Sequence, residues 1–415
     1  MPNAAAGRKI LFVEQFYYPD GWGGAELPLD LTIHLARAGY RVEVICGADQ
    51  YAPLKGAPPP DPRNEGIRLR RIPALLGGSI HRGKFLRQLW FYCALLPLLL
   101  LRRPPDLFVT QTNPPLAAVM VAAVGWACRR PVMIIAMDVY PEVLIAHGAI
   151  RDHGALGTIL KSAFGWAYRS ARRVIALGPV MSARLVSKGV EPARITEIPN
   201  WATGDLGLVT GAANALRREW QLEGKFVVLY SGNLGIAHEF DTVLRGVERA
   251  HRSMPALRVV FIGRGSRLTQ VKQRVAELEI DSIVHFSDPL AAARLPESFG
   301  MAHLALVTLQ PGFEGLVVPS KLQGYMARGV PVLYVGPDSD ADRFIKRSSC
   351  GVSIACNDVQ GVASALMDLA ADAGRLAALG RSGRQFYEAQ FSRSSGLAKY
   401  ESAIRSTLDP DGAAA

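Results

Sequence analysis

KILFVEQFYYPDGWGGAELPLDLTIHLARAGYRVEVIC, residues 9–46, is the stretch that decides the fold class of this chain. It opens on a short apolar run, residues 9–13, which is typical of a buried parallel strand. A glycine-containing loop at 20–24 and a helical stretch at 26–38, closed by Gly39, come next. RVEVIC, residues 41–46, then reads as a second strand. The order strand, loop, helix, strand predicts the opening of a doubly wound α/β domain.

The same alternation continues along the chain and then starts again. Further strands of the first sheet are expected at 107–110, 131–137, 173–177 and 195–198. Residues 201–224 are polar and rich in Gly and Ala, which predicts a domain boundary. The second alternation has expected strands at 226–231, 257–262, 282–286, 304–309, 330–335 and 351–355. The sequence therefore predicts two tandem Rossmann-like domains, with a cleft between the ends of their sheets.

Composition and charge limit the class of protein. The chain has 415 residues, of which 49% are hydrophobic and 20% charged, which excludes a disordered or fibrous protein. The five cysteines show no CxxC spacing, which argues against a disulfide framework or a zinc knuckle. Residues 1–200 carry 24 Lys and Arg against 14 Asp and Glu, whereas the rest carry 23 against 22. The basic half indicates either an anionic partner (nucleic acid, a membrane surface or a phosphorylated substrate) or an incidentally basic surface.

Two apolar runs of thirteen residues, 89–101 and 116–128, are both shorter than the ~20 residues that cross a bilayer. The second lies between two expected strands and is predicted to be a buried crossover helix. The first leaves two alternatives open, a core helix and an interfacial element on a membrane. The interfacial alternative rests on the basic residues that flank this run, which are Arg82, Lys84, Arg87, Arg102 and Arg103.

Three glycine-rich loops follow expected strands, at 21–26 (GWGGAE), 231–235 (SGNLG) and 261–265 (FIGRG). Glycine lets a ligand approach the backbone, and a helix N-terminus favours an anion. None has the GxGxxG spacing of dinucleotide binders, which argues against NAD. Ordinary tight turns are the alternative reading. The candidate ligand-binding residues of these loops are Gly23, Gly24, Glu26, Gly232, Asn233, Gly263, Arg264 and Gly265.

FEGLVVPSKLQGYMARGVPV, residues 313–332, is the strongest candidate for chemistry. Pro319 suits the first turn of a helix, which places Ser320 and Lys321 in that turn. Free N–H groups, the helix dipole and one ammonium would converge there and stabilise a leaving diphosphate without a metal. A solvated Lys321 is the alternative.

A second candidate follows a first-domain strand at MDVYPE, residues 137–142. Its carboxylates, Asp138 and Glu142, leave the edge of the expected sheet and would point toward the predicted cleft. A helix N-cap together with a surface glutamate is the alternative reading for this pair.

These motifs, together with TNPPL (112–116) and IPNWA (198–202), resemble in their order the glycosyltransferases of family 4, which have the GT-B fold. The resemblance covers about residues 8–405. Within the family, the chain is most similar to the bacterial group that builds surface polysaccharides and resembles fucosamine transferases. It implies a retaining, metal-independent transfer of a hexosyl-type sugar from a nucleotide donor, with UDP favoured and no cofactor beyond that substrate. The implied acceptor is a polyprenyl-diphosphate-linked sugar or a glycan. The implied location is cytoplasmic, peripheral on the anionic inner face of the membrane, with no nucleic-acid partner.

The resemblance also implies a role for each part of the chain. Residues 1–203 would bind the acceptor, residues 204–385 the nucleotide sugar, and 386–415 would form a helix that returns to the first domain, plus a tail. The implied catalytic residues are Asp138, Lys321 and Glu26. The implied donor-binding residues are Gly232, Asn233, Gly263, Arg264, Gly265, Glu314, Pro319, Ser320 and Lys321. The implied acceptor or phosphate loops contain Gly23, Gly24, Glu26, Tyr140, Glu142 and Asn200, and no metal ligand is expected.

Several positions depart from the family pattern. Leu316 and Gly324 stand where the family often has two glutamates, and Glu314 lies two residues out of that register. Asn233 and His238 stand where many relatives have Arg and Lys. Asp138 takes the place of the usual histidine of the first domain. These departures keep two rivals open: a nucleotide-sugar 2-epimerase, and a subunit that binds nucleotide sugar without turnover.

Overall fold

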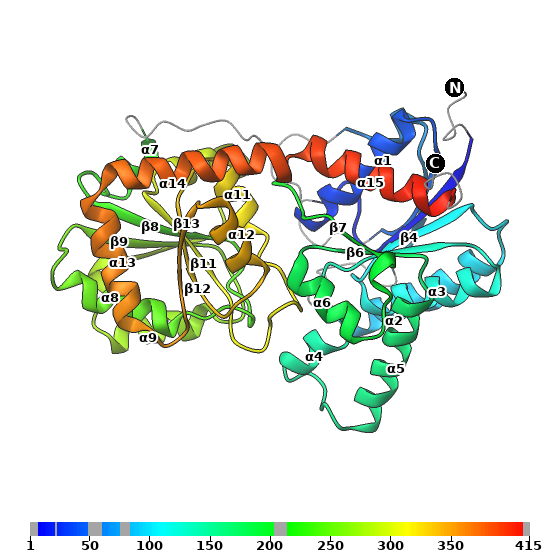
Figure 1. Cartoon of the computed structure of the whole chain (residues 1–415), viewed down its shortest axis with the longest axis horizontal. Helices are drawn as coiled ribbons and strands as arrows, with labels where there is room; N and C mark the ends of the chain where they lie inside the picture. Colours follow the sequence, from blue (N-terminus) through cyan, green and yellow to red (C-terminus); the bar gives the residue numbers. More distant parts are fainter. Residues whose placement is uncertain (1–6, 21–22, 49–59, 75–83, 203–213, 410–415) are drawn as a thin grey trace. The chain divides into compact units, whose positions relative to one another are not determined.

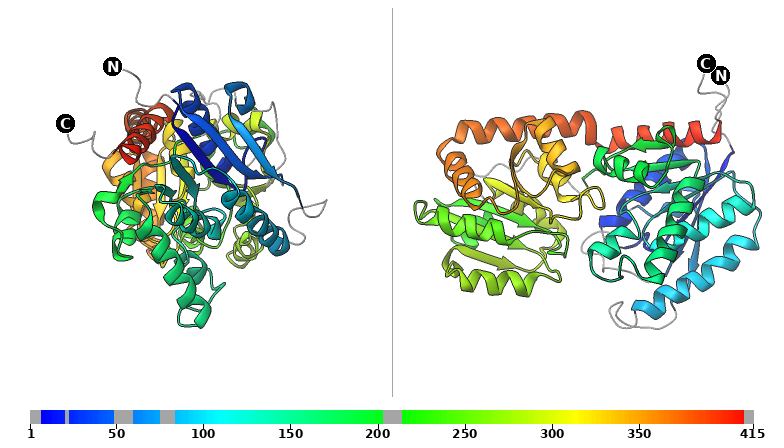
Figure 2. Two further views of the ribbon diagram at one scale, coloured as in Figure 1. Left: turned by 90° about the vertical axis from the view of Figure 1, so that its right-hand side faces the viewer. Right: turned by 60° about the horizontal axis from the view of Figure 1, so that its bottom comes forward.

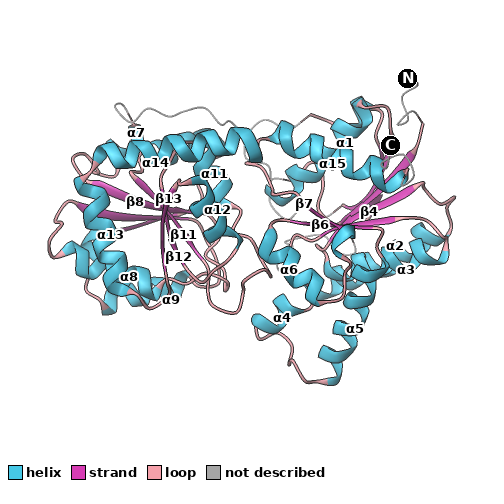
Figure 3. Cartoon of the chain, in the orientation of Figure 1, coloured by secondary structure: helices cyan, strands magenta, loops and turns pink. Residues whose placement is uncertain are grey.

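The structure is a computed structural model that describes residues 7–20, 23–48, 60–74, 84–202 and 214–409. It divides into two compact units, the first comprising Met1–Pro199 with Ser394–Ala415 and the second Asn200–Arg393. Each unit contains one parallel sheet with helices on both faces, coloured by element type in Figure 3. The predicted doubly wound α/β class is therefore confirmed.

The first sheet has seven strands in the order β3-β2-β1-β4-β5-β6-β7, and every neighbouring pair is parallel. Its strands are β1 (Lys9–Glu14), β2 (Arg41–Gly47), β3 (Arg68–Ile72), β4 (Leu107–Gln111), β5 (Val132–Ile135), β6 (Arg173–Ala176) and β7 (Ile195–Glu197). The apolar runs form the buried strands, as their composition predicts. The arginine-rich edge strand β3 is an addition to the predicted set.

Helices cover both faces of this sheet. They are α1 (Gly23–Arg37), α2 (Lys84–Leu100), α3 (Pro115–Ala127), α4 (Glu142–Ala146), α5 (Ala155–Ser170), α6 (Pro179–Ser187) and α15 (Arg393–Leu408). Figures 1 and 2 show α2 and α3 on one face of the sheet and α15 on the other. The predicted return of the terminal helix to the first domain is confirmed, because His34 Nε2 in α1 lies 2.8 Å from Glu401 Oε2 in α15.

The second sheet has six parallel strands in the order β10-β9-β8-β11-β12-β13. The strands are β8 (Phe226–Ser231), β9 (Leu257–Ile262), β10 (Val284–Ser287), β11 (Leu304–Thr308), β12 (Val332–Val335) and β13 (Gly351–Ile354). The helices are α7 (Ala215–Glu219), α8 (Asp241–His251), α9 (Leu268–Glu277), α10 (Leu295–Gly300), α11 (Lys321–Ala327), α12 (Asp340–Ser348), α13 (Val359–Ala371) and α14 (Ala373–Phe386). In Figure 1, α8, α9 and α13 lie on one face of the sheet and α11, α12 and α14 on the other.

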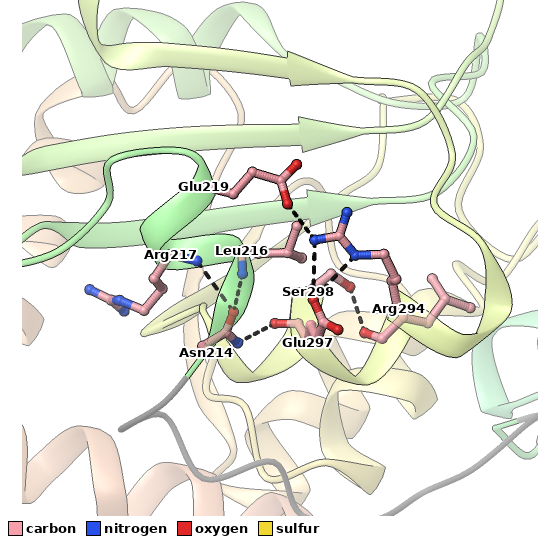
Figure 4. A network of polar contacts seen from close by, with 8 residues as sticks. Asn214, Leu216, Arg217, Glu219, Arg294, Glu297 and Ser298 are labelled. Carbon is pink, nitrogen blue, oxygen red and sulfur yellow. Dashed lines mark hydrogen bonds and ion pairs between the residues drawn. The ribbon is translucent and has the colours of Figure 1, made fainter.

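A polar network ties α7 to α10 at the beginning of the second unit (Figure 4). The side-chain oxygen of Asn214 accepts two backbone N–H groups of α7, and its amide donates to the carbonyl of Glu297 at 2.5 Å. Arg294 donates to Glu219 at 2.6 Å and to Glu297 at 3.3 Å. The two bonds that Asn214 accepts satisfy the N–H groups of Leu216 and Arg217, which would otherwise have no partner within the helix.

The division between units differs from the predicted boundaries at 203/204 and 385/386. Residue Asn200, expected in the first domain, belongs to the second unit. The reason is local packing, since Trp201 is buried and the backbone N–H of Ala202 donates to Tyr387 Oη at 3.3 Å. The helical turn Tyr387–Phe391 also belongs to the second unit, where the Phe391 ring lies 4.9 Å from that of Phe344.

Helix α2, which contains most of the ambiguous apolar run, has two apolar faces. Its inner face is buried through Phe91, Leu95 and Leu99. Its outer face keeps about half of each leucine exposed, namely Leu86 (52%), Leu89 (47%), Leu96 (43%) and Leu100 (57%). The core alternative is therefore confirmed for the inner face, and the outer face leaves apolar side chains exposed. Among the described helices, none combines the length and the apolar character needed to cross a membrane.

Candidate active site

Lys321, the first residue of α11, lies at the centre of a cluster in the second unit. Its Nζ donates to Tyr230 Oη at 2.9 Å and lies 3.2 Å from His238 Nε2. The same ammonium lies 4.4 Å from the centre of the Tyr230 ring, within reach of a cation–π interaction. Tyr230 lies near the carboxyl end of β8, and His238 lies in the loop between β8 and α8. Strand β8, this loop and α11 therefore meet at the lysine amine.

The hydrogen bonds of His238 fix its tautomer. Its Nδ1 lies 2.8 Å from the carbonyl oxygen of Thr308, so Nδ1 carries the proton and donates it. Nε2 is then the acceptor for the Lys321 ammonium. Burial, reinforced by the charge of Lys321, lowers the pKa of His238 to about 3. The histidine is therefore neutral at physiological pH and holds the lysine by its lone pair.

Burial lowers the pKa of Lys321 to about 7. In the part of the chain that is described, no carboxylate forms an ion pair with this amine, so no countercharge offsets the cost of burying its charge. The amine therefore loses its proton far more readily than an exposed lysine does. An anion brought to Nζ would favour the charged form and raise the pKa again.

The glycines of the two loops beside Lys321 are needed for close packing. Gly232 has a φ of +139°, and a Cβ there would lie 3.1 Å from Lys321 Cε. Gly263 has a φ of +148°, and its Cβ would lie 2.0 Å from the carbonyl oxygen of Gly232. A Cβ on Gly265 would lie 2.3 Å from the oxygen of Leu234. Any side chain at Gly263 or Gly265 would separate the loops, so these glycines hold the wall of the site in place.

Arg264, predicted to bind the donor, is engaged in an ion pair. Arg264 forms a two-bond ion pair with Asp288, at 2.9 and 3.0 Å, and both side chains are exposed. Arg267 is the cation that the sequence interpretation missed. Its guanidinium hydrogen-bonds the side chain of Gln310, and its charge contributes to lowering the pKa of His238. The only signal for it was its position in the loop after β9.

The remaining predicted donor residues surround α11 and the loop before it. Pro319 precedes the N-cap and does not lie in the first turn, because the helix begins at Lys321 with Ser320 as its N-cap. Ser320 makes no side-chain cap bond. The Glu314 carboxylate accepts the N–H of Gly312 at 2.9 Å, which ties it to its own loop. Helix α11 has only seven residues, so the ammonium of Lys321 is the main charge here.

Asn233 is exposed at the loop after β8. Its backbone carbonyl accepts the Tyr230 hydroxyl at 2.7 Å. This bond leaves the Tyr230 oxygen as the acceptor for Lys321. Asn233 therefore contributes to the cluster through its backbone carbonyl. A contribution of this kind cannot be predicted from the type of its side chain.

In the first unit, Asp138 follows β5 at the carboxyl edge of the sheet. Its backbone is anchored on both sides by the Thr112 hydroxyl, which donates to the Asp138 carbonyl at 2.9 Å and lies 3.1 Å from its N–H. Burial raises the pKa of the Asp138 carboxyl to about 6. Tyr140 stacks on Phe164, with ring centres 5.7 Å apart. A carboxyl with this pKa exchanges a proton easily near neutral pH.

Two other predicted residues, Glu142 of the MDVYPE motif and Asn200 of the IPNWA motif, differ in their surroundings. Glu142 forms an ion pair with Lys188 at 2.5 Å, and both side chains are largely buried. The pair lies at the start of α4, and the second carboxylate oxygen of Glu142 is buried without a hydrogen-bond partner among the described residues. The side-chain oxygen of Asn200 is buried and has no hydrogen-bond partner among the described residues.

The predicted GWGGAE loop is shorter than expected, because α1 already begins at Gly23. Gly23, Gly24 and Glu26 therefore lie in the first helical turn, while Gly21 and Trp22 lie outside the described residues.

The sequence interpretation missed Glu14, the last residue of β1. Its carboxyl is 2% exposed, and burial holds its pKa well above the usual range. Across the described residues, no group of three or more His, Cys, Asp and Glu side chains is arranged to hold a metal ion.

Comparison with known proteins identifies the family. A family model described as "Glycosyl transferase 4-like domain" matches residues 23–201, and one described as "Glycosyl transferases group 1" matches residues 213–386. The chain is 28% identical over 313 residues to the "Probable glycosyltransferase WbjE" of Pseudomonas aeruginosa, an alignment that covers 74% of this chain and 76% of that protein.

Two further matches extend the comparison. The GDP-mannose-dependent alpha-(1-6)-phosphatidylinositol monomannoside mannosyltransferase of Mycolicibacterium smegmatis is 25% identical over 53% of this chain and 55% of its own length. The crystal structure of Anabaena HepE in complex with UDP-glucose is similar in fold, with a TM-score of 0.71 and 16% identity over 96% of this chain and 99% of that one. The two family matches, the order of the motifs and the fold together show that the chain belongs to the family 4 glycosyltransferases of the GT-B fold.

Proposed function

We propose that this glycosyltransferase moves a sugar, with retention, from a UDP-linked donor to a lipid-linked or glycan acceptor during assembly of cell-surface polysaccharide. The observation that carries the proposal is the buried Lys321 amine, held by the neutral groups of Tyr230 and His238. Such an amine is suited to an anion that arrives and leaves, because the anion supplies the missing countercharge. A nucleoside diphosphate is that kind of anion. HepE, which shares the fold, is described with UDP-glucose, and this supports the choice of UDP.

In the proposed reaction, the bond between the sugar and the diphosphate breaks while Lys321 neutralises charge on the leaving oxygens. Preorganised donors of this kind are worth more at a water-excluded site than in water. The acceptor hydroxyl then bonds to the same face of the sugar, and its proton passes to the departing phosphate. We propose that no metal ion and no covalent enzyme intermediate take part. Asp138 and Glu26 are proposed to position hydroxyl groups of the sugar or acceptor.

A donor panel tests this function against its two rivals. The full chain would be incubated with UDP-, GDP- and dTDP-sugars, with and without a lipid extract, and nucleoside diphosphate release measured. Release that needs the extract supports a transferase. Conversion of the nucleotide sugar to its isomer without extract would identify a 2-epimerase. Thermal stabilisation by a donor, which amounts to about 2.7 kcal/mol at a hundred times Kd, without any turnover would identify a binding subunit.

We also propose that the first unit docks on the cytoplasmic face of a membrane through the exposed leucines of α2. The expected basic flanks contribute less than the sequence suggests. Arg87 is buried, Arg102 forms an ion pair with the buried Glu43, and Arg103 is exposed. Arg82 and the side chain of Lys84 lie outside the described residues. Binding driven mainly by apolar side chains should therefore change little with salt, whereas binding through the five flanking charges would weaken as the salt concentration rises.

Substitution of Leu96 tests this docking surface. Leu96→Glu places a charge among the exposed leucines of α2 and should weaken vesicle binding about tenfold or more. Val186→Glu on α6 is a matched control, since Val186 is 40% exposed and Leu96 is 43% exposed. Co-sedimentation with vesicles at low and high salt provides the measurement. Equal weakening by both substitutions would contradict docking through α2.

A further inference from the structure

An open pocket lies at the edge of the first sheet where β5, β6 and β7 begin. It has a volume of about 770 Å³. Its lining includes Trp126 near the end of α3, Leu408 at the end of α15, and the arginines Arg129, Arg130, Arg172 and Arg194. Because the strands are parallel and Asp138 follows the carboxyl end of β5, this pocket is at the opposite edge of the sheet from Asp138. Within the first unit it is therefore separate from Asp138.

The pocket is strongly basic. Four guanidinium groups line it, and no carboxylate is among the lining residues. Three carboxylates of neighbouring segments are engaged in pairs, which are Asp106–Arg130 (3.5 Å), Glu191–Arg194 (3.0 Å) and Asp409–Arg8 (2.8 Å). Within the described ranges, Arg129 and Arg172 have no carboxylate partner. Two full positive charges are therefore left over at the pocket.

Stabilisation of helix ends accounts for only part of this cluster. Helices α3 and α5 both end here, and arginines favour the negative end of a helix dipole. Arg194 serves in this way, since its Nη1 donates to the carbonyl of Arg169 at 3.2 Å. Arg129 and Arg172 make no such bond within the described part of the chain. Arg129 also has a φ of +53°, a left-handed conformation in which glycine or asparagine is usual, so its backbone position does not explain its side chain.

Trp126 gives the pocket one flat apolar wall. Its side chain is 70% exposed, and its ring stands edge-on to that of Trp166, with centres 6.5 Å apart. Guanidinium groups present paired N–H donors whose geometry matches the oxygens of a phosphate. An indole beside them can cover the carbon skeleton to which a phosphate is attached.

We propose that this arginine pocket binds the phosphate group of a phosphate ester. The ester is either the headgroup of an anionic lipid or a soluble metabolite, which present the same chemistry. The lipid source gains support from the topology, because α2 and α3 run antiparallel to the strands and both end at this edge. Leu101, directly after α2, is 87% exposed. The proposal does not depend on the proposed function, since none of its residues lies at the candidate active site.

The experiment compares two double variants of the full chain that lose the same charge. R129Q/R172Q alters the two arginines of the pocket that lack a carboxylate partner. R68Q/R151Q, the control, removes two exposed arginines elsewhere in the first unit. Binding of glycerol 3-phosphate is measured by calorimetry, and binding to vesicles of phosphatidylglycerol is compared with binding to phosphatidylcholine. Thermal unfolding of both variants shows that each is folded.

We expect R129Q/R172Q to weaken phosphate binding more than about tenfold, because each charge-assisted hydrogen bond contributes on the order of tenfold in affinity. The control should stay within about twofold of the wild type. Loss of the phosphatidylglycerol preference in R129Q/R172Q alone assigns the site to lipid headgroups. Loss confined to glycerol 3-phosphate assigns it to soluble esters. If neither ligand shows a loss specific to R129Q/R172Q, the proposal is overturned.

Discussion

At the residue scale, the properties of Lys321 follow from its neighbours. Tyr230 and His238 accept hydrogen bonds from its amine but carry no charge, because His238 donates its one proton to Thr308. A carboxylate in either position would hold the lysine permanently charged and would compete with an anionic ligand. The neutral His238 therefore accepts a hydrogen bond from the lysine without adding a second charge.

The lowered pKa of Lys321 predicts a pH dependence of UDP binding. The free protein loses the Lys321 proton as the pH rises through about 7, whereas a bound diphosphate favours the protonated amine. Since the terminal phosphate of UDP is already ionised above pH 7, affinity should fall by up to about tenfold per pH unit there. Calorimetry in two buffers of different ionisation enthalpy should detect proton uptake in the wild type and none in Lys321→Ala. Affinity that is constant from pH 7 to 8.5 would contradict this account.

Glu14 predicts a pH dependence of stability instead. Burial raises the pKa of its carboxyl, so the folded state keeps a proton that the unfolded state loses above about pH 4.5. Stability should therefore fall as the pH rises through this range, by up to about 1.4 kcal/mol per unit. Glu14→Gln removes the effect, and its stability relative to the wild type should improve between pH 5 and pH 8. Denaturant unfolding measures this, with the exposed Glu197→Gln as control, and a relative loss at pH 8 would refute it.

At the scale of elements, the loops after β8 and β9 hold each other through their backbones. The N–H of Gly232 donates to the carbonyl of Ile262 at 2.9 Å, and the N–H of Leu234 donates to that of Arg264, also at 2.9 Å. The site around Lys321 depends on this contact, because Gly232 lies against the lysine side chain. Glycine is required where the two loops meet.

Gly263→Ala tests the contact between these loops. The new Cβ would lie 2.0 Å from a backbone oxygen, so we expect a loss of about 2–4 kcal/mol in the unfolding free energy. Gly312→Ala is the matched control, since Gly312 also has a positive φ but no heavy atom within 4 Å of the added Cβ. The control should lose only about 1 kcal/mol, from backbone strain alone. Similar losses in both variants, measured by urea unfolding, would show that loop packing does not set the cost.

The elements also show what the sequence could predict. Apolar runs identified the buried strands, because a strand covered on both faces needs apolar side chains throughout. The edge strand β3, RLRRI, was missed because an edge strand tolerates charge, and its Arg70 pairs with Glu43 of β2 at 2.7 Å. The sequence of α2 could not show which of its faces is buried, because both faces of the helix are apolar.

At the scale of the whole molecule, the alternation of strands and helices predicted two doubly wound units, and the terminal helix returns to the first as the resemblance implied. Lys321 was also predicted. Its hydrogen bonds to Tyr230 and His238, and the bond between His238 and Thr308, were not, because these residues come from segments far apart in the sequence. Arg264 was expected to bind the donor, and its ion pair with Asp288 was not predicted, since pairing depends on positions that spacing does not reveal.

The central claim, that the Lys321 amine stabilises a leaving nucleoside diphosphate, is tested most directly by turnover of Lys321 variants with the donor found in the panel. Lys321→Ala, and Lys321→Met as a variant that fills the same space, should keep the thermal stability of the wild type within a few degrees. Their kcat should fall about 10²–10³-fold, as expected for loss of one preorganised donor. Lys272→Ala, which removes an exposed lysine of the same unit, should leave kcat unchanged. Wild-type kcat in folded Lys321→Ala would contradict the account.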